Sequence, residues 1–267
     1  MNVARHLRRL WLYVIAALVA LFLVAPIALI VPMSFSASEF LTFPPPGWSL
    51  RWYQAYLGSV EWQRATWVSL RIALCTMVLA TIIGALTSYG LHRGRLRLNG
   101  AIFGIILLPA VVPAVLIAVG AFVLFARVGL NNTFTGLILA HTALALPFVV
   151  LLIGSAMRQY DWDLDRAARS LGASPLRAFI DVVFPQMKFS FLSGALVAFL
   201  TSFDEVVISI FISSGDRATL TKKMFTALRN DIDPVIAAIA TLLIGFSVVV
   251  MVLSIVAARG RDARASG

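Results

Sequence analysis

The stretch Leu10–Met33, LWLYVIAALVALFLVAPIALIVPM, contains no charged side chain. An α-helix needs about 20 apolar residues to cross the hydrocarbon core of a bilayer, so this stretch predicts a transmembrane helix. It is too long for the apolar region of a cleaved signal peptide, which runs to about 15 residues. We therefore expect it to be retained as the first span of an integral membrane protein.

Five further apolar runs are long enough to cross a bilayer. The six predicted spans are Leu10–Met33, Ala65–Leu91, Ala101–Phe125, Gly136–Met157, Phe189–Ser213 and Pro234–Ala258. The runs are continuous rather than alternating, which favours helices over barrel strands. Hydrophobic residues make up 60% of the chain and charged residues 13%, an excess of apolar side chains that a soluble globule of this size cannot bury. We predict an all-α membrane protein with a single transmembrane domain over residues 1–267.

The positive charges set the expected orientation. With the N-terminus inside, the inner segments hold 14 Lys and Arg residues and the outer segments hold 7. Because basic residues accumulate in cytoplasmic loops, this bias predicts an N-in/C-in topology. The same pattern explains the net charge of +10 as a signal of membrane topology, so this charge does not indicate nucleic-acid binding. The single cysteine, Cys75, excludes an internal disulfide and a cysteine-rich metal site.

The fourth connecting loop, Arg158–Lys188, carries the signals of two short helices with a sharp turn between them. Asp161 or Asp163 can cap the first helix by accepting backbone N–H bonds. Gly172 can end it in a left-handed conformation. Ser174 can then cap the second helix, with the following proline at its first position. We expect an ordered loop on the cytoplasmic side.

Within this loop the sequence resembles the EAA motif of ABC-importer permeases, which reads Glu-Ala-Ala, three residues, Gly, nine residues, Ile, one residue, Leu-Pro. The matching residues are Ala167, Ala168, Gly172, Val182, Phe184 and Pro185. Arg166 stands where the motif has Glu, and Asp165 offers a carboxylate one residue earlier. We expect Pro185 to close the loop.

The resemblance implies a type I ABC-importer permease whose coupling loop contacts a dimer of ATPase subunits. The expected contact residues are Asp165, Arg166, Ala167, Ala168, Arg169, Gly172, Ala173, Ser174 and Pro175. An amphipathic helix on the inner membrane surface is the alternative.

The resemblance further implies a second permease subunit, an extracytoplasmic substrate-binding protein and a bacterial cytoplasmic membrane. The sequence has no Gly-x-x-x-x-Gly-Lys-Ser/Thr run, so ATP and Mg are expected in the partner ATPase. This chain itself is expected to be non-catalytic and to hold no cofactor or metal.

The stretch Gly194–Ser214 resembles the fifth helix of the second permease of spermidine/putrescine importers, which implies a polyamine cargo. Permeases for ferric iron, thiamine and opines share parts of this architecture and stay open as alternatives. A lipid-facing acid at mid-membrane costs about 2.5–3.5 kcal/mol, so the acids here are expected to face protein or water. The candidate substrate-pathway residues are Ser202, Phe203, Asp204 and Glu205.

Neighbouring helical residues point about 100° apart, so we expect one of Asp204 and Glu205 to line the pathway and the other to make a structural contact. A structural ion pair, for instance with Arg71, is the alternative. An ion-coupled secondary transporter would typically show internal repeats with broken helices, and no clear repeat is seen. An intramembrane enzyme would need more than Cys75 and His141, and we expect His141 to be a hydrogen-bonded packing residue.

Two outer segments have an undecided role. Ser34–Arg64 combines a proline run with five Trp and Tyr residues, typical of an interfacial anchor or of a contact surface for an external partner. Ser214–Asp233 mixes both charge signs and predicts an amphipathic helix at the outer surface.

Overall fold

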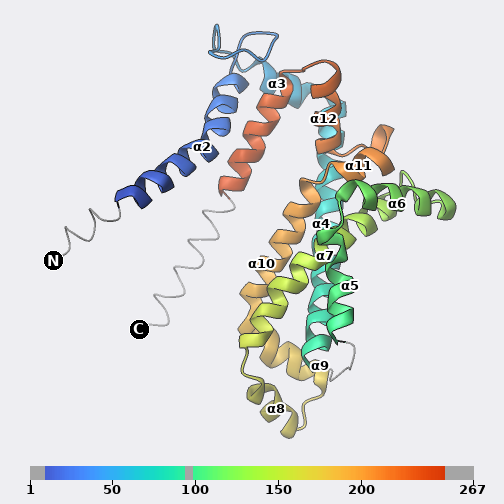
Figure 1. The fold of residues 1–267 in the computed structure, drawn as a ribbon. Coiled ribbons are helices and arrows are strands. Elements are labelled where there is room, and N and C mark those ends of the chain that lie inside the picture. The colour runs from blue at the N-terminus through green and yellow to red at the C-terminus, as the bar shows by residue number, and fades with distance from the viewer. Residues whose placement is uncertain (1–9, 94–98, 250–267) are drawn as a thin grey trace. The chain divides into compact units, whose positions relative to one another are not determined.

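The structure is a computed structural model that describes residues 10–93 and 99–249, and the described chain is almost entirely helical (Figure 1). The elements are α2 (Leu10–Ser34), α3 (Arg51–Gly58), α4 (Val60–Arg93), α5 (Asn99–Val111), α6 (Ala114–Val128), α7 (Phe134–Gln159), α8 (Trp162–Ser170), α9 (Pro175–Ala178), the π-helical turn η1 (Phe179–Val183), α10 (Phe184–Phe203), α11 (Val207–Ile212), the 3-10 turn η2 (Gly215–Arg217), α12 (Leu220–Asn230) and a last helix over Val235–Val249. The chain divides into two compact units, residues 64–225 and the remainder.

The smaller unit contains α2, the following loop, α3 and the last helix. The loop closes where Ala37 N donates to Gly47 O at 2.9 Å and Ser49 N donates to Phe35 O at 2.7 Å. The proline run lies inside this closed loop, which agrees with the inability of proline to continue a helix. Trp48 is 72% exposed. The role of the segment Ser34–Arg64 as an interfacial anchor or a contact surface stays a prediction.

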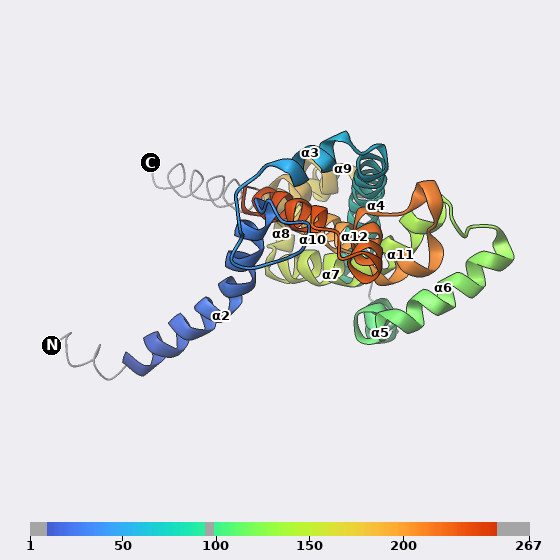
Figure 2. The ribbon, with the colours of Figure 1, turned by 90° about the horizontal axis from the view of Figure 1, so that it is seen from above.

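The larger unit is organised around α7, which is buried along most of its length. One end of α7 packs with α4, η1 and α10 through a cluster that includes Ala80, Val149, Ile153 and Phe191. The other end packs with α4, α6 and α11 through a second cluster. Figures 1 and 2 show α10 running along α7, and α6 turned away beside α11.

Small residues let these helices approach closely. A Cβ atom on Gly84 of α4 would lie 2.6 Å from Cγ1 of Val149, far inside contact distance. A Cβ on Gly194 of α10 would lie 3.4 Å from Cγ1 of Ile153. Transmembrane helices pack largely through such van der Waals contact, so glycine here sets the distance between α7 and its two neighbours.

Four helices in the described part of the chain are long and apolar enough to cross a membrane: α2, α4, α7 and the helical run Pro175–Phe203. The first three confirm the first, second and fourth predicted spans as helices. The last helix covers residues 235–249 of the sixth predicted span, whose remainder lies outside the described residues. The six-span count and the N-in/C-in orientation stay predictions.

The third predicted span, Ala101–Phe125, is wrong as a single helix. It is divided into α5 and α6, whose axes differ by 102°. The break falls at Val112–Pro113, where α5 ends and α6 begins after the proline. Proline has no N–H to donate and its ring clashes with the preceding turn, which accounts for the bend.

The fifth predicted span, Phe189–Ser213, is also wrong as a single helix. The helix ends at Phe203, and α11 begins only at Val207. At its start the helix extends further back than predicted, so Pro185 does not close the coupling loop. The π-helical turn before it, in which Phe184 N bonds to Phe179 O, lets the helix continue through a residue that lacks an N–H.

Candidate functional site

The first candidate site is the coupling loop, which runs from the end of α7 at Gln159 to the start of α10 at Phe184 and whose turn chemistry follows the prediction. Asp161 Oδ1 accepts a bond from Asp163 N at 3.0 Å and caps α8. Gly172 adopts φ +92° after α8, a conformation that favours glycine. Ser174 Oγ accepts a bond from Arg177 N at 3.3 Å and caps α9. Local side-chain caps therefore fix the path of this loop.

Asp165 is the one residue of the predicted contact set that is turned fully inward. It is 0% exposed, although most of α8 is exposed. Arg93 Nη2, from the end of α4, lies 3.1 Å from Asp165 Oδ2. The two charges are in contact, while neither Asp165 oxygen accepts a well-aligned hydrogen bond from a described residue. The carboxylate thus depends on Arg93 to offset its burial.

A cluster of aromatic rings surrounds this ion pair. The Arg93 guanidinium lies 5.7 Å from the ring centroid of Trp162. Trp162 contacts Tyr89 at 5.9 Å, and Tyr89 contacts Phe179 at 5.3 Å in an edge-on arrangement. Phe179 in turn contacts Phe191 of α10. The coupling loop is therefore held to both α4 and α10 by packed rings and one ion pair.

Sequence reasoning missed Arg93 and Trp162 as parts of this site. Arg93 counted only toward topology, because nothing local links it to an aspartate 72 positions later in the chain. The sequence held one signal for this pair. Asp165 lies in an alanine-rich motif, and a carboxylate that becomes buried there needs a cation beside it.

The outward face of the loop is apolar at its tip and basic at its side. Leu171 is 90% exposed and Leu176 is 67% exposed. A hollow of about 520 Å³ beside them is lined by Arg93, Arg166 and Arg169. The other predicted contact residues, from Arg166 to Pro175, are exposed or half-buried, and Ala173 and Pro175 also line the hollow. Exposed leucines flanked by arginines suit a partner groove with apolar walls and an acidic rim.

The second candidate site is the break between α10 and α11. Asp204 is the C-cap of α10, and its N–H donates to Leu200 O at 3.0 Å. Glu205 Oε1 accepts a bond from Ile208 N at 2.7 Å and so caps the start of α11. The expectation that both acids lie within one helix is therefore wrong, since they occupy the gap between two helices.

A buried polar network supports the break. His141 Nδ1 lies 2.9 Å from Ser202 Oγ, and its Nε2 lies 3.4 Å from Ser209 Oγ. Thr221 Oγ1 donates to the Glu205 carbonyl at 2.9 Å. The prediction that His141 is a hydrogen-bonded packing residue is confirmed. These bonds tie α7 to both sides of the break.

Asp204 differs from Glu205 in its surroundings. It is exposed, and it takes part in none of the ion pairs found among the described residues. Arg71, the suggested partner, pairs with neither acid there. The neighbouring rings of Phe199 and Phe203 stack at 5.4 Å. Three groups at this point attract cations: the Asp204 carboxylate, the aromatic ring face and the carbonyl end of α10.

Comparisons with known proteins identify relatives of the chain as a whole. The profile of the family described as "binding-protein-dependent transport system inner membrane component" matches residues 80–262. The "Putrescine transport system permease protein PotI" of Escherichia coli strain K12 is 33% identical over 252 residues, 92% of this chain and 89% of that protein. The "Spermidine/putrescine transport system permease protein PotC" of Haemophilus influenzae is 32% identical over 249 residues, 93% and 95% of the two chains.

A solved structure shows the fold. A chain of a bacterial ABC transporter involved in the import of the acidic polysaccharide alginate superposes with a TM-score of 0.75. The superposition covers 94% of this chain and 96% of that chain, at 18% sequence identity.

Proposed function

This chain belongs to the family of binding-protein-dependent transport system inner membrane components, the permease subunits of ABC importers, and we propose that its cargo is a polyamine such as putrescine or spermidine. Two relatives that cover most of the chain are named for these cargoes. In the proposed transporter it pairs with a second permease in a bacterial inner membrane. An ATPase dimer supplies ATP and Mg chemistry, and an extracytoplasmic binding protein delivers the cargo.

The observation that carries the substrate proposal is the exposed carboxylate of Asp204 at the end of α10. A polyamine presents ammonium groups separated by methylene chains. An ammonium can bind the Asp204 carboxylate, and the ring face of Phe203 can add cation–π attraction. Glu205 is already engaged in capping α11, so we assign it the structural role and Asp204 the pathway role.

The broken helix by itself does not distinguish an ABC permease from an ion-coupled transporter, since such transporters also bind cargo at helix breaks. Family membership decides between them, because it accounts for the whole chain and for the coupling loop.

Uptake kinetics of labelled putrescine in cells that lack the chain, complemented by variants, test the substrate assignment. Asp204→Asn is expected to raise KM about 10- to 100-fold, since a charge-assisted hydrogen bond contributes about 1.5–3 kcal/mol. Glu205→Gln keeps an oxygen that can accept the Ile208 N–H, so KM changes by less than about threefold. Asp231→Asn, an exposed acid outside the break, is the matched control. An unchanged KM in Asp204→Asn contradicts the pathway role.

The outward face of the coupling loop is the proposed contact with the ATPase dimer. Its exposed Leu171 and Leu176 would enter an apolar groove, with acidic residues of the ATPase opposite Arg166 and Arg169. Asp165 acts from inside the loop, as a residue that positions α8. The arginine in place of the motif's glutamate predicts a partner with the opposite charge at that point.

The coupling assignment is tested in proteoliposomes that contain the whole transporter. Leu171→Asp is expected to abolish putrescine uptake and the stimulation of ATP hydrolysis by loaded binding protein. Leu171→Met, which keeps an apolar side chain of similar size at the same exposed position, is expected to keep both. Normal stimulation in Leu171→Asp overturns the assignment.

A further inference from the structure

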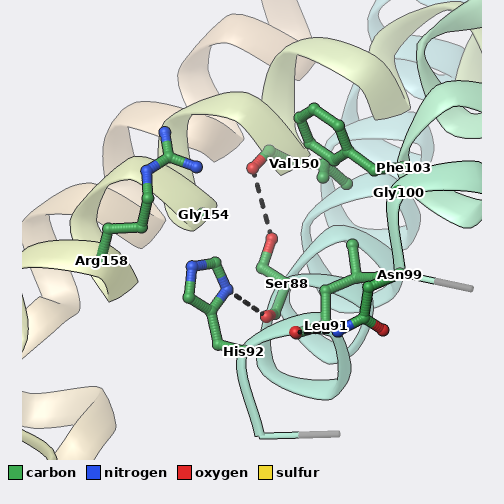
Figure 3. Close-up of a pocket in the computed structure, with 9 residues that line it drawn as sticks. All are labelled: Ser88, Leu91, His92, Asn99, Gly100, Phe103, Val150, Gly154 and Arg158. Carbon is green, nitrogen blue, oxygen red and sulfur yellow. Dashed lines mark hydrogen bonds between the residues drawn. The ribbon is translucent and has the colours of Figure 1, made fainter. Parts of the chain in front are cut away.

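A pocket of about 250 Å³ lies in the larger unit, among the last turns of α4, the first turns of α5 and the last turns of α7 (Figure 3). It is separate from the helix break and from the outward face of the coupling loop. Leu91, Phe103 and Val150 supply apolar walls from the three helices. His92 and Arg158 add two basic side chains to the lining.

The polar groups of the pocket divide into occupied and available ones. Ser88 Oγ donates to Val150 O at 3.3 Å, and Asn99 Nδ2 donates to Leu91 O at 2.9 Å. His92 Nδ1 bonds the Ser88 carbonyl at 2.8 Å, which leaves Nε2 on the side of Arg158 (Figure 3). Arg158 is exposed, and neither it nor His92 forms an ion pair with a described residue. Within the described part of the chain, the Arg158 guanidinium therefore has no anionic partner.

Helix length places the pocket at the edge of the hydrocarbon core. The 26 residues of α7 span about 39 Å at 1.5 Å per residue, whereas the core is about 30 Å thick. At least one end of α7 must therefore leave the core, and the charged Arg158 in the last turn favours this end. Val150, about two turns earlier, lies at the depth of the lipid chains. The basic groups and the apolar walls match the two parts of a lipid in the right order.

We propose that this pocket binds an anionic phospholipid, with its phosphate between His92 and Arg158 and the start of an acyl chain against Leu91, Phe103 and Val150. Basic pockets between transmembrane helices are known sites for anionic headgroups. A zwitterionic lipid brings its own cation, which the Arg158 guanidinium repels. Free phosphate has no apolar part to cover the walls.

Photo-crosslinking tests the proposal on the complete transporter, purified through this chain and placed in phosphatidylcholine nanodiscs. The probes are a photoactivatable phosphatidylglycerol and its phosphatidylcholine analogue. Mass spectrometry reads the adducts on peptides that contain Phe103 and Val150. An arginine near a membrane contributes about 1 kcal/mol, so phosphatidylglycerol labelling is expected to exceed phosphatidylcholine labelling by about fivefold.

Two variants remove the site in different ways. His92→Gln with Arg158→Gln removes the guanidinium charge and the imidazole, and labelling by phosphatidylglycerol should fall to the phosphatidylcholine level. Gly154→Leu keeps His92 and Arg158 but extends a side chain from a position whose Cβ would lie 3.7 Å from His92 Cε1, and should block entry. Arg127→Gln, an exposed arginine in the last turn of α6, is the matched control.

Three outcomes overturn the proposal. One is full phosphatidylglycerol labelling in both variants. Another is equal labelling of the wild type by the two lipids, which indicates a site that reads only the acyl chain. The third is loss of labelling upon addition of inorganic phosphate, which indicates an anion site without a lipid. None of these readouts depends on the transported cargo.

Discussion

Replacing Arg93 by glutamine is the most informative perturbation of the coupling loop. Asp165 is fully buried, and the Arg93 side chain is 27% exposed. Removing the arginine leaves a buried carboxylate without a partner, which typically costs about 3–5 kcal/mol. Because a factor of ten corresponds to 1.4 kcal/mol, the locally opened state of α8 should become more populated by roughly two to three and a half orders of magnitude.

The reverse change should be much milder. Asp165→Asn removes the buried charge, and Arg93 can turn its guanidinium to water. The loss is then that of the close contact between the two charges, which costs less than the roughly 3–5 kcal/mol of Arg93→Gln because no buried charge is left unpaired. The double variant Arg93→Gln with Asp165→Asn should be more stable than Arg93→Gln alone, since no buried charge is left unpaired.

Hydrogen exchange of the backbone amides of α8 and α9 in the purified transporter measures this opening. Arg177→Gln is the matched control, because it breaks the exposed pair with Asp181, which contributes only about 0.3–0.5 kcal/mol. Two results contradict this explanation. One is an equal increase in hydrogen exchange in Asp165→Asn and Arg93→Gln. The other is faster exchange in the double variant than in either single variant.

Two further predictions concern glycines. Gly172→Ala should destabilise the coupling loop by about 1–2 kcal/mol, and the cost comes from the backbone φ of +92° because no atom lies within 4 Å of the added Cβ. Gly172→Asn should cost less, because asparagine tolerates this conformation better. Equal hydrogen exchange in wild type and Gly172→Ala would falsify this account. Gly84→Ala should lower the unfolding temperature of the purified transporter, because overpacking against Val149 costs about 1–3 kcal/mol. Gly90→Ala in the same helix meets no atom and should be neutral or stabilising, so a larger loss there than at Gly84 contradicts the packing argument.

The sequence predicted what depends on neighbouring residues. The uninterrupted apolar runs of α2, α4 and α7 indicated helices because length and hydropathy alone decide whether a segment can span a bilayer. The caps at Asp161 and Ser174 were equally predictable, since each bonds an N–H two or three residues away. The coupling loop could therefore be outlined before the fold was known.

The breaks and the long-range contacts could not be read in the same way. The mean hydropathy stays high across Pro113 and across the run from Ser202 to Glu205, because apolar residues flank both, so it did not indicate either helix break. In hindsight the second run had a signal, since Glu205 stands three residues before the Ile208 N–H that it caps. The Arg93–Asp165 pair joins two distant helices and needed the fold itself.

The central claim is that this permease carries a polyamine, and uptake by cells is its most direct test. The gene is deleted in a strain without another polyamine importer, and ATP-dependent entry of labelled putrescine and spermidine is measured. The account predicts loss of uptake that wild type restores fully and Asp204→Asn restores only at high substrate concentration. Unchanged uptake after deletion contradicts the polyamine assignment and directs the search to ferric iron, thiamine and opines.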